Sequence, residues 1–298
     1  MDFEIIIIGG SYAGVAAATT LGRSLRKVLV IDGGKPCNRQ TPHSHNFLTR
    51  DGETPAAIAD KAKEQLASYK TVKTVTDFVI DGSKQPDGFK VLTQDGHTYT
   101  AQKLLFATGI TDIMPQIMGF AECWGISAIH CPYCHGYEVH HQPTGILANG
   151  DMGFEIAKLI SNWTDELTLF TNGASTLTTE QVQKIKTKNI KIAEGEVQSI
   201  IHENGQMKSV VMQGDQPYPL TAMYARLPFT QHSDLPKQLG CEFTEAGHIA
   251  VDGFNRTNVP GVYAAGDNVS PMRAVAVTVA GGVMAGAAIN KDMIEEGF

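Results

Sequence analysis

The residues whose types and spacing could do chemistry are Cys131 and Cys134, which flank Pro132 and Tyr133 and are followed at once by His135. Two cysteines at this spacing can close a small disulfide ring, and a neighbouring base or helix start lowers the pKa of a thiol so that thiolate forms near neutral pH. His135 could accept a proton from one thiol and return it to a leaving thiolate. The motif therefore predicts a redox-active dithiol, with Cys131, Cys134 and His135 as its catalytic residues.

The alternatives for this motif are half of a zinc site and a pair of inert buried thiols. Three histidines lie near it in the sequence, at His130, His140 and His141. A structural zinc usually needs a second cysteine or histidine pair at a defined spacing, which Cys123 and Cys241 do not provide, so we expect no metal. We interpret these two cysteines and Cys37 as small hydrophobic side chains. Five cysteines with one close pair fit a reducing compartment better than a disulfide scaffold.

A second candidate site lies at the amino end, in residues 4–32. A run of four isoleucines predicts a buried strand, which is followed by a glycine-rich turn, a helix of small residues and a second apolar strand that ends at Asp32. In such a unit Gly9 permits the tight turn, Gly14 permits close helix packing, and the amides at the helix start meet a pyrophosphate. Ser11 stands in place of the usual middle glycine. We expect a bound adenine dinucleotide whose ribose contacts Asp32, with a purely structural βαβ crossover as the alternative.

The segments after this unit predict an insertion and a second domain. Residues 33–52 form a polar loop that is long enough to wrap a ligand, although its histidines could be merely solvated. Residues 72–100 alternate like short strands and contain a hairpin signal at Asp95 and Gly96, which predicts an antiparallel meander inserted into the α/β unit. A buried strand at 103–109 returns to that unit, and residues 111–115 then cross to the second domain.

Residues 144–170 repeat the opening strand, turn and helix in a weaker form. Ala148 takes the place of the first glycine of the turn, and the next strand ends without an acid at residues 171–173. No arginine lies between Arg50 and Arg226 to clamp a 2′-phosphate. The pattern predicts the shape of a dinucleotide-binding domain and leaves NAD(P)H binding open.

Near the carboxyl end, a buried strand at 261–266 closes on Asp267, whose carboxylate can accept hydrogen bonds from a polyol such as ribityl. The helix expected at 272–289 consists of small residues that suit close packing. Its amino end could also favour electron density on a flavin ring, and the two roles are compatible.

Composition limits the number of domains, the kinds of partner and the location that we expect. The chain has 298 residues, 42% hydrophobic residues and a net charge of -7 with dispersed basic residues, so we expect two domains or one large domain and no nucleic-acid partner. The amino terminus lacks the basic start and apolar length of a signal peptide, and no apolar run reaches the roughly 18 residues of a membrane span. We therefore expect a cytoplasmic protein that does not contact a membrane.

Taken in this order, these motifs resemble the low-molecular-weight thioredoxin reductase family, of the pyridine nucleotide-disulfide oxidoreductases, over essentially the full length. The resemblance implies a homodimer of α/β chains with two Rossmann-like dinucleotide-binding domains, the first discontinuous with an inserted antiparallel β-meander. An FAD-binding domain would comprise 1–113 and 245–298, and a pyridine-nucleotide-like domain at 114–244 would carry the CxxC. Cys134 would be the flavin-proximal thiol and Cys131 the one that exchanges with substrate. The residues expected to bind FAD are Gly9, Ser11, Tyr12, Ala13, Gly14, Asp32, Gly33, Arg39, His45, Asn46, Thr108, Gly109, Gly266, Asp267, Arg273 and Ala274.

Three departures from that family pattern lie at His135, Ala148 and residues 171–173, which replace an acid, a glycine and a His-Arg-Arg element. With CPYCHGYE and HSHNFLTRDG, they resemble the flavin dithiol oxidases that close disulfides in gliotoxin- and holomycin-type metabolites. This implies an FAD-dependent thiol-disulfide oxidoreductase that oxidises a dithiol, either a small molecule or a thioredoxin-like protein, and uses oxygen or another small acceptor. An NAD(P)H-dependent disulfide reductase and a redox-sensing flavoprotein without turnover are the alternatives.

Overall fold

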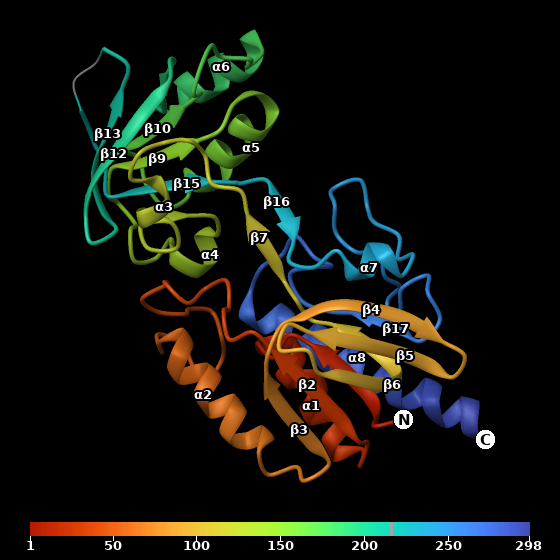
Figure 1. Cartoon of the computed structure of the whole chain (residues 1–298). Helices are drawn as coiled ribbons and strands as arrows, with labels where there is room; N and C mark the ends of the chain where they lie inside the picture. Colours follow the sequence, from red (N-terminus) through yellow and green to blue (C-terminus); the bar gives the residue numbers. More distant parts are fainter. Residues whose placement is uncertain (215–216) are drawn as a thin grey trace. The chain divides into compact units, whose positions relative to one another are not determined.

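The computed structural model describes residues 1–214 and 217–298 and divides the chain into two compact units (Figure 1). Unit 1 comprises Met1–Arg39, Asn46–Thr111 and Phe229–Phe298, and unit 2 comprises Gln40–His45 and Asp112–Pro228. The α/β fold predicted from the sequence is confirmed.

The sheet of unit 1 has the order β3-β2-β1-β6-β5-β4, and β17 pairs with β6 beside β5. Its strands are β1 (Phe3–Ile8), β2 (Val28–Asp32), β3 (Val72–Thr76), β4 (Val79–Gln85), β5 (Gly88–Thr93), β6 (Thr98–Phe106) and β17 (Val262–Ala264). Strands β3, β2, β1, β6 and β17 run parallel, whereas β4, β5 and β6 form an antiparallel meander. The prediction of an antiparallel meander over 72–100 is thus wrong for its first strand, because β3 joins the parallel sheet beside β2.

Alternation along β1 explains why this sheet is covered on both faces. Ile5 and Ile7 are buried in a cluster with three helices, and Ile6 and Ile8 are buried in a cluster on the opposite face. The helices are α1 (Tyr12–Arg23), α2 (Pro55–Leu66) and α8 (Val275–Gly297). Helix α8 approaches α1 so closely that a Cβ on Gly282 would lie 2.2 Å from a backbone oxygen, which confirms the close packing expected of its small residues.

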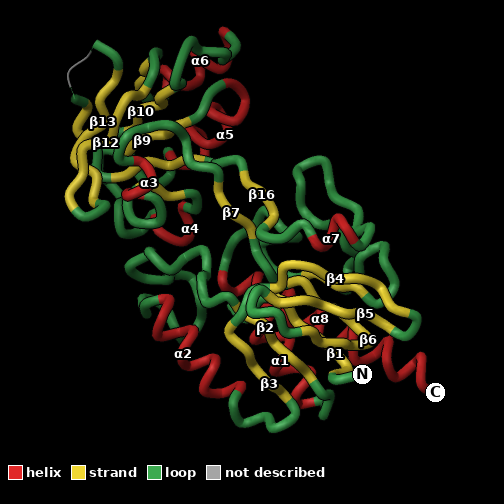
Figure 2. Tube along the Cα trace, in the orientation of Figure 1, coloured by secondary structure: helices red, strands yellow, loops and turns green. Residues whose placement is uncertain are grey.

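The chain leaves unit 1 through β7 (Ile110–Asp112) and returns through β16 (Phe229–Gln231), and these two strands pair with each other (Figure 2). The chain therefore re-enters unit 1 at Phe229, whereas the sequence predicts that the second segment of the FAD-binding domain begins at residue 245. The reason is packing, because Leu235, in the short helix α7 (Leu235–Gln238), lies in the buried cluster of unit 1.

Unit 2 contains a parallel five-stranded sheet of order β11-β10-β9-β15-β8 and an antiparallel sheet of order β12-β13-β14. Its strands are β8 (Ala128–Ile129), β9 (Thr144–Leu147), β10 (Leu167–Phe170), β11 (Lys191–Ala193), β12 (Val197–Glu203), β13 (Gln206–Met212), β14 (Tyr218–Pro219) and β15 (Ala222–Ala225). Its helices are α3 (Phe120–Cys123), α4 (Pro132–His135), α5 (Gly150–Ile160) and α6 (Thr179–Thr187). The repeated strand, turn and helix predicted from residue 144 are confirmed as β9, α5 and β10. No helix in the described part of the chain has both the length and the apolar character needed to cross a membrane.

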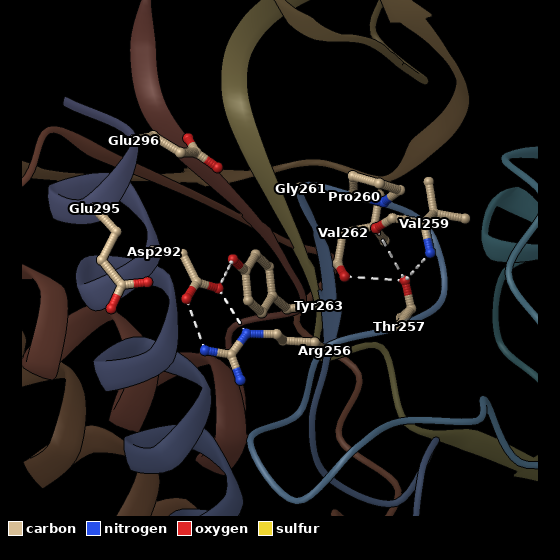
Figure 3. A pocket seen from close by; sticks show the side chains of 10 residues that line it. All are labelled: Arg256, Thr257, Val259, Pro260, Gly261, Val262, Tyr263, Asp292, Glu295 and Glu296. Atoms are coloured by element: carbon tan, nitrogen blue, oxygen red, sulfur yellow. Dashed lines mark hydrogen bonds and ion pairs between the residues drawn. The ribbon is translucent and has the colours of Figure 1, made fainter. Parts of the chain in front are cut away.

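A partly buried polar network ties α8 to β17 in unit 1 (Figure 3). The Tyr263 hydroxyl donates to Asp292 Oδ2 at 2.6 Å, and Arg256 donates to both carboxylate oxygens of Asp292, from Nε at 2.7 Å and from Nη2 at 2.6 Å. These groups line a hollow of about 370 Å³ whose rim carries Glu295 and Glu296. Because its central polar groups are paired with one another, we interpret this network as a structural anchor.

Candidate active site

Cys131 lies directly beyond β8, at the start of the short helix α4. Cys131 and Cys134 are both free thiols in the structure. The Cys134 side chain donates a hydrogen bond to the Cys131 sulfur, and the backbone N–H groups of Cys134 and Tyr133 add two more, which lower the pKa of Cys131 from 9.0 to about 7 although burial opposes the shift. Cys131 is therefore partly thiolate at neutral pH, as a redox-active cysteine needs to be.

His135 is a neutral base beside the cysteine pair. Burial lowers the pKa of His135 below its usual 6.5, the charge of His45 lowers it further, and the charge of Glu138 opposes them. His45 lies beside Glu138, since its Nε2 is 3.4 Å from Glu138 Oε1. A neutral imidazole can accept a proton from an incoming thiol, which fits the role expected of His135.

In unit 1, the first glycine-rich turn forms a tight cradle. Gly9 has a φ of +104°, and a Cβ there would lie 2.2 Å from the backbone oxygen of Ala107. A Cβ on Gly14 would lie 1.8 Å from the oxygen of Gly9, so α1 packs directly on the turn. Within the described residues, Ser11 at the N-cap makes no side-chain hydrogen bond to the helix amides. This turn fits the pyrophosphate of a dinucleotide, which helix-start amides can bind.

Several other residues expected to bind FAD lie at the carboxyl ends of the unit 1 strands. Asp32 Oδ1 accepts a hydrogen bond from the Gly10 N–H at 3.1 Å. Thr108 follows β6, and its Oγ1 is buried without a hydrogen-bond partner among the described residues. Gly109, with a φ of +67°, and Gly266, with a φ of +97°, both have backbone conformations that favour glycine. An unpaired buried hydroxyl at this edge is available to a ligand, which supports the fit of FAD.

Asp267 lies at the end of β17 in a polar cluster. Its Oδ2 lies 3.5 Å from Arg273 Nε, and its Oδ1 accepts from Thr278 Oγ1 at 3.2 Å. Burial raises the pKa of Asp267, while the charge of Arg273 acts in the opposite direction. Cys37 is exposed and donates its S–H to Asp267 Oδ2 at 3.7 Å, so the interpretation of Cys37 as a small hydrophobic side chain is wrong. Ala274 is the N-cap of α8.

The other expected FAD residues are divided between the two units. Tyr12 accepts a hydrogen bond from Asn38 in unit 1, where Ala13, Gly33, Arg39 and Asn46 also lie. His45 belongs instead to unit 2, where it pairs with Glu138. The structure therefore places His45 in the same unit as the CxxC, and the other residues of the expected FAD set in unit 1.

The second glycine-rich turn, at the start of α5, is closed by its own side chains. Asn149 Oδ1 accepts hydrogen bonds from the Gly150 N–H at 2.8 Å, the Thr176 N–H at 2.9 Å and the Thr176 hydroxyl at 3.2 Å. Asn149 Nδ2 donates to the Ala174 oxygen at 2.8 Å. Asn149 thus occupies one of the helix-start amides that can bind a phosphate, whereas Ser11 in the first turn occupies none within the described part of the chain.

Comparison with known proteins agrees with this geometry. The sequence pattern of the family described as pyridine nucleotide-disulphide oxidoreductase matches residues 3–282, which is most of the chain. The chain belongs to this family.

Individual relatives extend that assignment. A protein named thioredoxin reductase tcpT, from Claviceps purpurea, is 29% identical over 95% of this chain and 92% of its own length. The solved structure of a putative thioredoxin reductase TrxB from Bacillus anthracis has a TM-score of 0.94 and 30% identity over 99% of this chain and 100% of that one. The structure of HlmI has a TM-score of 0.93 and 30% identity over 99% of this chain and 93% of that one. The resemblance to thioredoxin reductases is confirmed.

This pyridine nucleotide-disulphide oxidoreductase is thus a thioredoxin reductase-like enzyme of a family that acts on disulfides. The family implies binding of FAD and NAD(P)H. The first turn fits FAD by its open helix start and tight glycine contacts, whereas the second turn has its amide occupied by Asn149. Among residues 1–214 and 217–298, no three side chains of the histidine, cysteine, aspartate and glutamate types are grouped to hold a metal.

The sequence reasoning missed two residues of this site. Glu138 lies three residues after His135, which is the spacing that brings side chains together on a helical turn and could have indicated that the Glu138 charge acts on His135. Asn149 precedes the helix start at Gly150, and asparagine is a preferred N-cap, so a capping role could also have been predicted.

Proposed function

We propose that this protein is an FAD-dependent dithiol oxidase, in which a substrate dithiol reduces the Cys131–Cys134 disulfide. The observation that carries the proposal is the hydrogen bonding of Asn149 at the second turn, which satisfies one of the helix-start amides that face a nicotinamide dinucleotide in a turn of this kind. The absence of arginine between Arg50 and Arg226 in the sequence supports it, since no guanidinium from that stretch can hold a 2′-phosphate.

The exchange chemistry follows from the thiol pKa. A thiolate of the substrate attacks Cys131 Sγ, a substrate–Cys131 disulfide forms, and the Cys131–Cys134 bond breaks with its electron pair on Cys134. The second substrate thiolate then attacks the first substrate sulfur and releases Cys131 as thiolate. Once Cys134 takes up a proton, its S–H donates to Cys131 and holds the pKa of Cys131 at about 7, which makes Cys131 a good leaving group. The products are one substrate disulfide and the reduced cysteine pair.

The proton transfers of this exchange fall to His135. Because burial lowers its pKa, His135 is neutral at pH 7 and can accept the proton of an incoming thiol. The carboxylate of Glu138 favours the charged imidazole that results, and His45, held 3.4 Å from Glu138, opposes it.

FAD, when bound, supplies the two-electron acceptor that restores the disulfide, with oxygen or another small oxidant as final acceptor. The residues of this chain that would hold it are those of the first turn, Asp32 and the cluster around Asp267. Gly9 and Gly14 shape the turn, and the unpaired Thr108 hydroxyl offers a hydrogen bond at the same edge.

Anaerobic rapid mixing of the purified yellow protein tests this function. We expect the visible flavin absorbance to fall with dithiothreitol and not with NADH or NADPH, and hydrogen peroxide to form once air is admitted. The matched control is Cys131→Ser, which should no longer respond to the dithiol. Rapid loss of absorbance with NADPH would refute the oxidase and establish the reductase. If none of these donors reduced the flavin, the sensor without turnover would remain.

We also propose that the chain forms a homodimer, as the family resemblance implies. A hollow of about 720 Å³ lies over α1, α2 and α8 of unit 1 and is lined by Val279 and Val283. Val283 and Met284 are exposed on α8, and burial against a second copy would remove this apolar surface from water. Light scattering should give twice the chain mass, and Val283→Glu should give the single-chain mass with the flavin retained.

A further inference from the structure

A short turn of unit 1, residues 46–53, presents an apolar side chain to water. Leu48 is 87% exposed, whereas Phe47 and Thr49 on either side of it line the hollow of about 720 Å³ over α1, α2 and α8. Leu48 is therefore on the rim of this hollow and projects from it. A single exposed leucine is common on a protein surface, so its meaning depends on what surrounds it.

The turn holds Leu48 in a fixed position. The Asn46 N–H donates a hydrogen bond to Asp51 Oδ1 at 2.6 Å, which closes the turn across its base. Thr49 has a φ of +71°, in the left-handed region that a β-branched residue rarely adopts. Strained backbone of this kind is typical of segments that clamp a ligand or a partner. A side chain that is held in place before binding loses less entropy when it binds.

The hollow beside Leu48 offers an apolar lining to which all three helices contribute. The apolar residues are Val15 of α1, Ile58 of α2, and Val279 and Val283 of α8. Val283 is 45% exposed, and Met284 next to it is exposed to the same extent. Entry of a leucine side chain into this hollow would remove apolar surface from water on both sides of the contact. Leu48 and the hollow are therefore complementary in polarity.

The charges of the hollow and of the turn are complementary as well. Every charged side chain that lines the hollow, among the residues that the structure describes, is basic. These residues are Arg23, Arg50 and Lys61. Arg50 and Lys61 each have an acid partner at 2.9 Å within the chain, but these pairs are solvent-exposed and can be exchanged for others at little cost in free energy. The turn beside Leu48 carries the acids Asp51 and Glu53, so a basic hollow favours this turn as its occupant.

We propose that Leu48 of each of two copies of this chain enters the hollow of the other copy. Because the projecting residue and the hollow adjoin on one surface, a two-fold contact forms both interactions at once and leaves neither open to a third copy. Tyr12 also lines the hollow, and the turn begins at Asn46, so this contact adjoins two residues of the expected FAD set. The inference rests on the proposed homodimer, identifies what fills its hollow, and does not depend on the oxidase chemistry.

Sedimentation velocity of the yellow holoenzyme over a range of concentrations measures the dimer dissociation constant and tests this contact. Leu48→Lys places a positive charge in a basic hollow. The matched control is Ile80→Lys, since Ile80 is 57% exposed on β4 of the same unit and is not one of the residues that line the hollow. We expect Leu48→Lys to raise the dissociation constant about hundredfold, because the two-fold contact repeats a tenfold loss at each hollow. Ile80→Lys should leave the dissociation constant unchanged.

The opposite charge at the same position gives a second comparison. Leu48→Glu loses the same apolar contact but meets basic side chains, so it should weaken the dimer less than Leu48→Lys does. Equal dissociation constants for Leu48→Lys and Ile80→Lys would overturn the proposal and leave the homodimer in place, as would a dimer that Leu48→Glu weakens at least as much as Leu48→Lys. A wild-type protein that sediments as a single chain at every concentration would remove the homodimer as well. Reduction of the flavin by a dithiol is measured separately, so none of these results can be confused with failure of the oxidase.

Discussion

Replacement of Cys134 by alanine should shift the pH profile of Cys131 reactivity to higher pH. The hydrogen bond from the Cys134 side chain is the largest of the interactions that lower the pKa of Cys131 from 9.0 to about 7. Without it, the pKa returns toward 9, and the thiolate fraction at pH 7 falls from about one half to about one hundredth. A more basic thiolate is intrinsically more reactive, by roughly 0.4 to 0.5 logarithmic units for each pKa unit. The net effect at pH 7 is therefore a loss of only about five- to eightfold.

Above about pH 8, the alanine variant becomes the faster of the two proteins. At pH 10 the alanine variant should react about six- to ninefold faster than the wild type, and the two rate profiles should cross near pH 8, which is about midway between the two pKa values. The assay is iodoacetamide alkylation of Cys131 followed by mass spectrometry, with Cys134→Ser as the control that keeps a hydroxyl donor. Cys123 and Cys241, whose burial raises their pKa values, serve as unreactive references. Parallel profiles that never cross would refute the assignment of Cys134 as the donor.

Three further predictions follow from the fold and its titrating groups. Asp292→Ala should lower the free energy of unfolding by about 2 kcal/mol in urea, because it leaves the Tyr263 hydroxyl without its acceptor and Arg256 with only its pair to Asp252, and an effect no larger than that of Glu295→Ala would contradict this. Gly14→Ala should yield protein without FAD, since its Cβ would lie 1.8 Å from a backbone oxygen, whereas Gly153→Ala, with contacts of 3.2 Å, should retain the yellow colour. Because the pKa of His135 is below 6.5 in the folded state, the unfolded chain binds protons first, and stability falls as pH drops below about 6.5. His135→Gln should therefore lose less stability between pH 7.5 and 5.5 than the wild type, as urea midpoints will show.

The parts of the fold that the sequence predicts correctly are those encoded by neighbouring residues. Four isoleucines, a glycine-rich turn and a helix of small residues give β1 and α1, and the hairpin at Asp95 and Gly96 joins β5 to β6. The CxxC can likewise be predicted from the sequence, because its chemistry depends on two residues only three positions apart.

The rest depends on contacts between distant segments, which periodicity does not encode. The alternation in β3 is the same for parallel and antiparallel pairing, so only its place beside β2 decides the direction. The return at Phe229 is fixed by Leu235, whose buried neighbours are far away in the chain. His45 was expected with the cofactor and is placed in unit 2 by its contact with Glu138.

The short excursion of residues 40–45 into unit 2 means that the chain passes between the units at four junctions, 39/40, 45/46, 111/112 and 228/229. Unit 2 is therefore assembled from two pieces of sequence, the smaller of which supplies His45 to Glu138 and Gln40 to the close surroundings of Gly125. A chimera that transplants residues 112–228 from one relative into another would leave this small piece behind. Recombination should exchange substrate preference between family members only when residues 40–45 and residues 112–228 are transferred together.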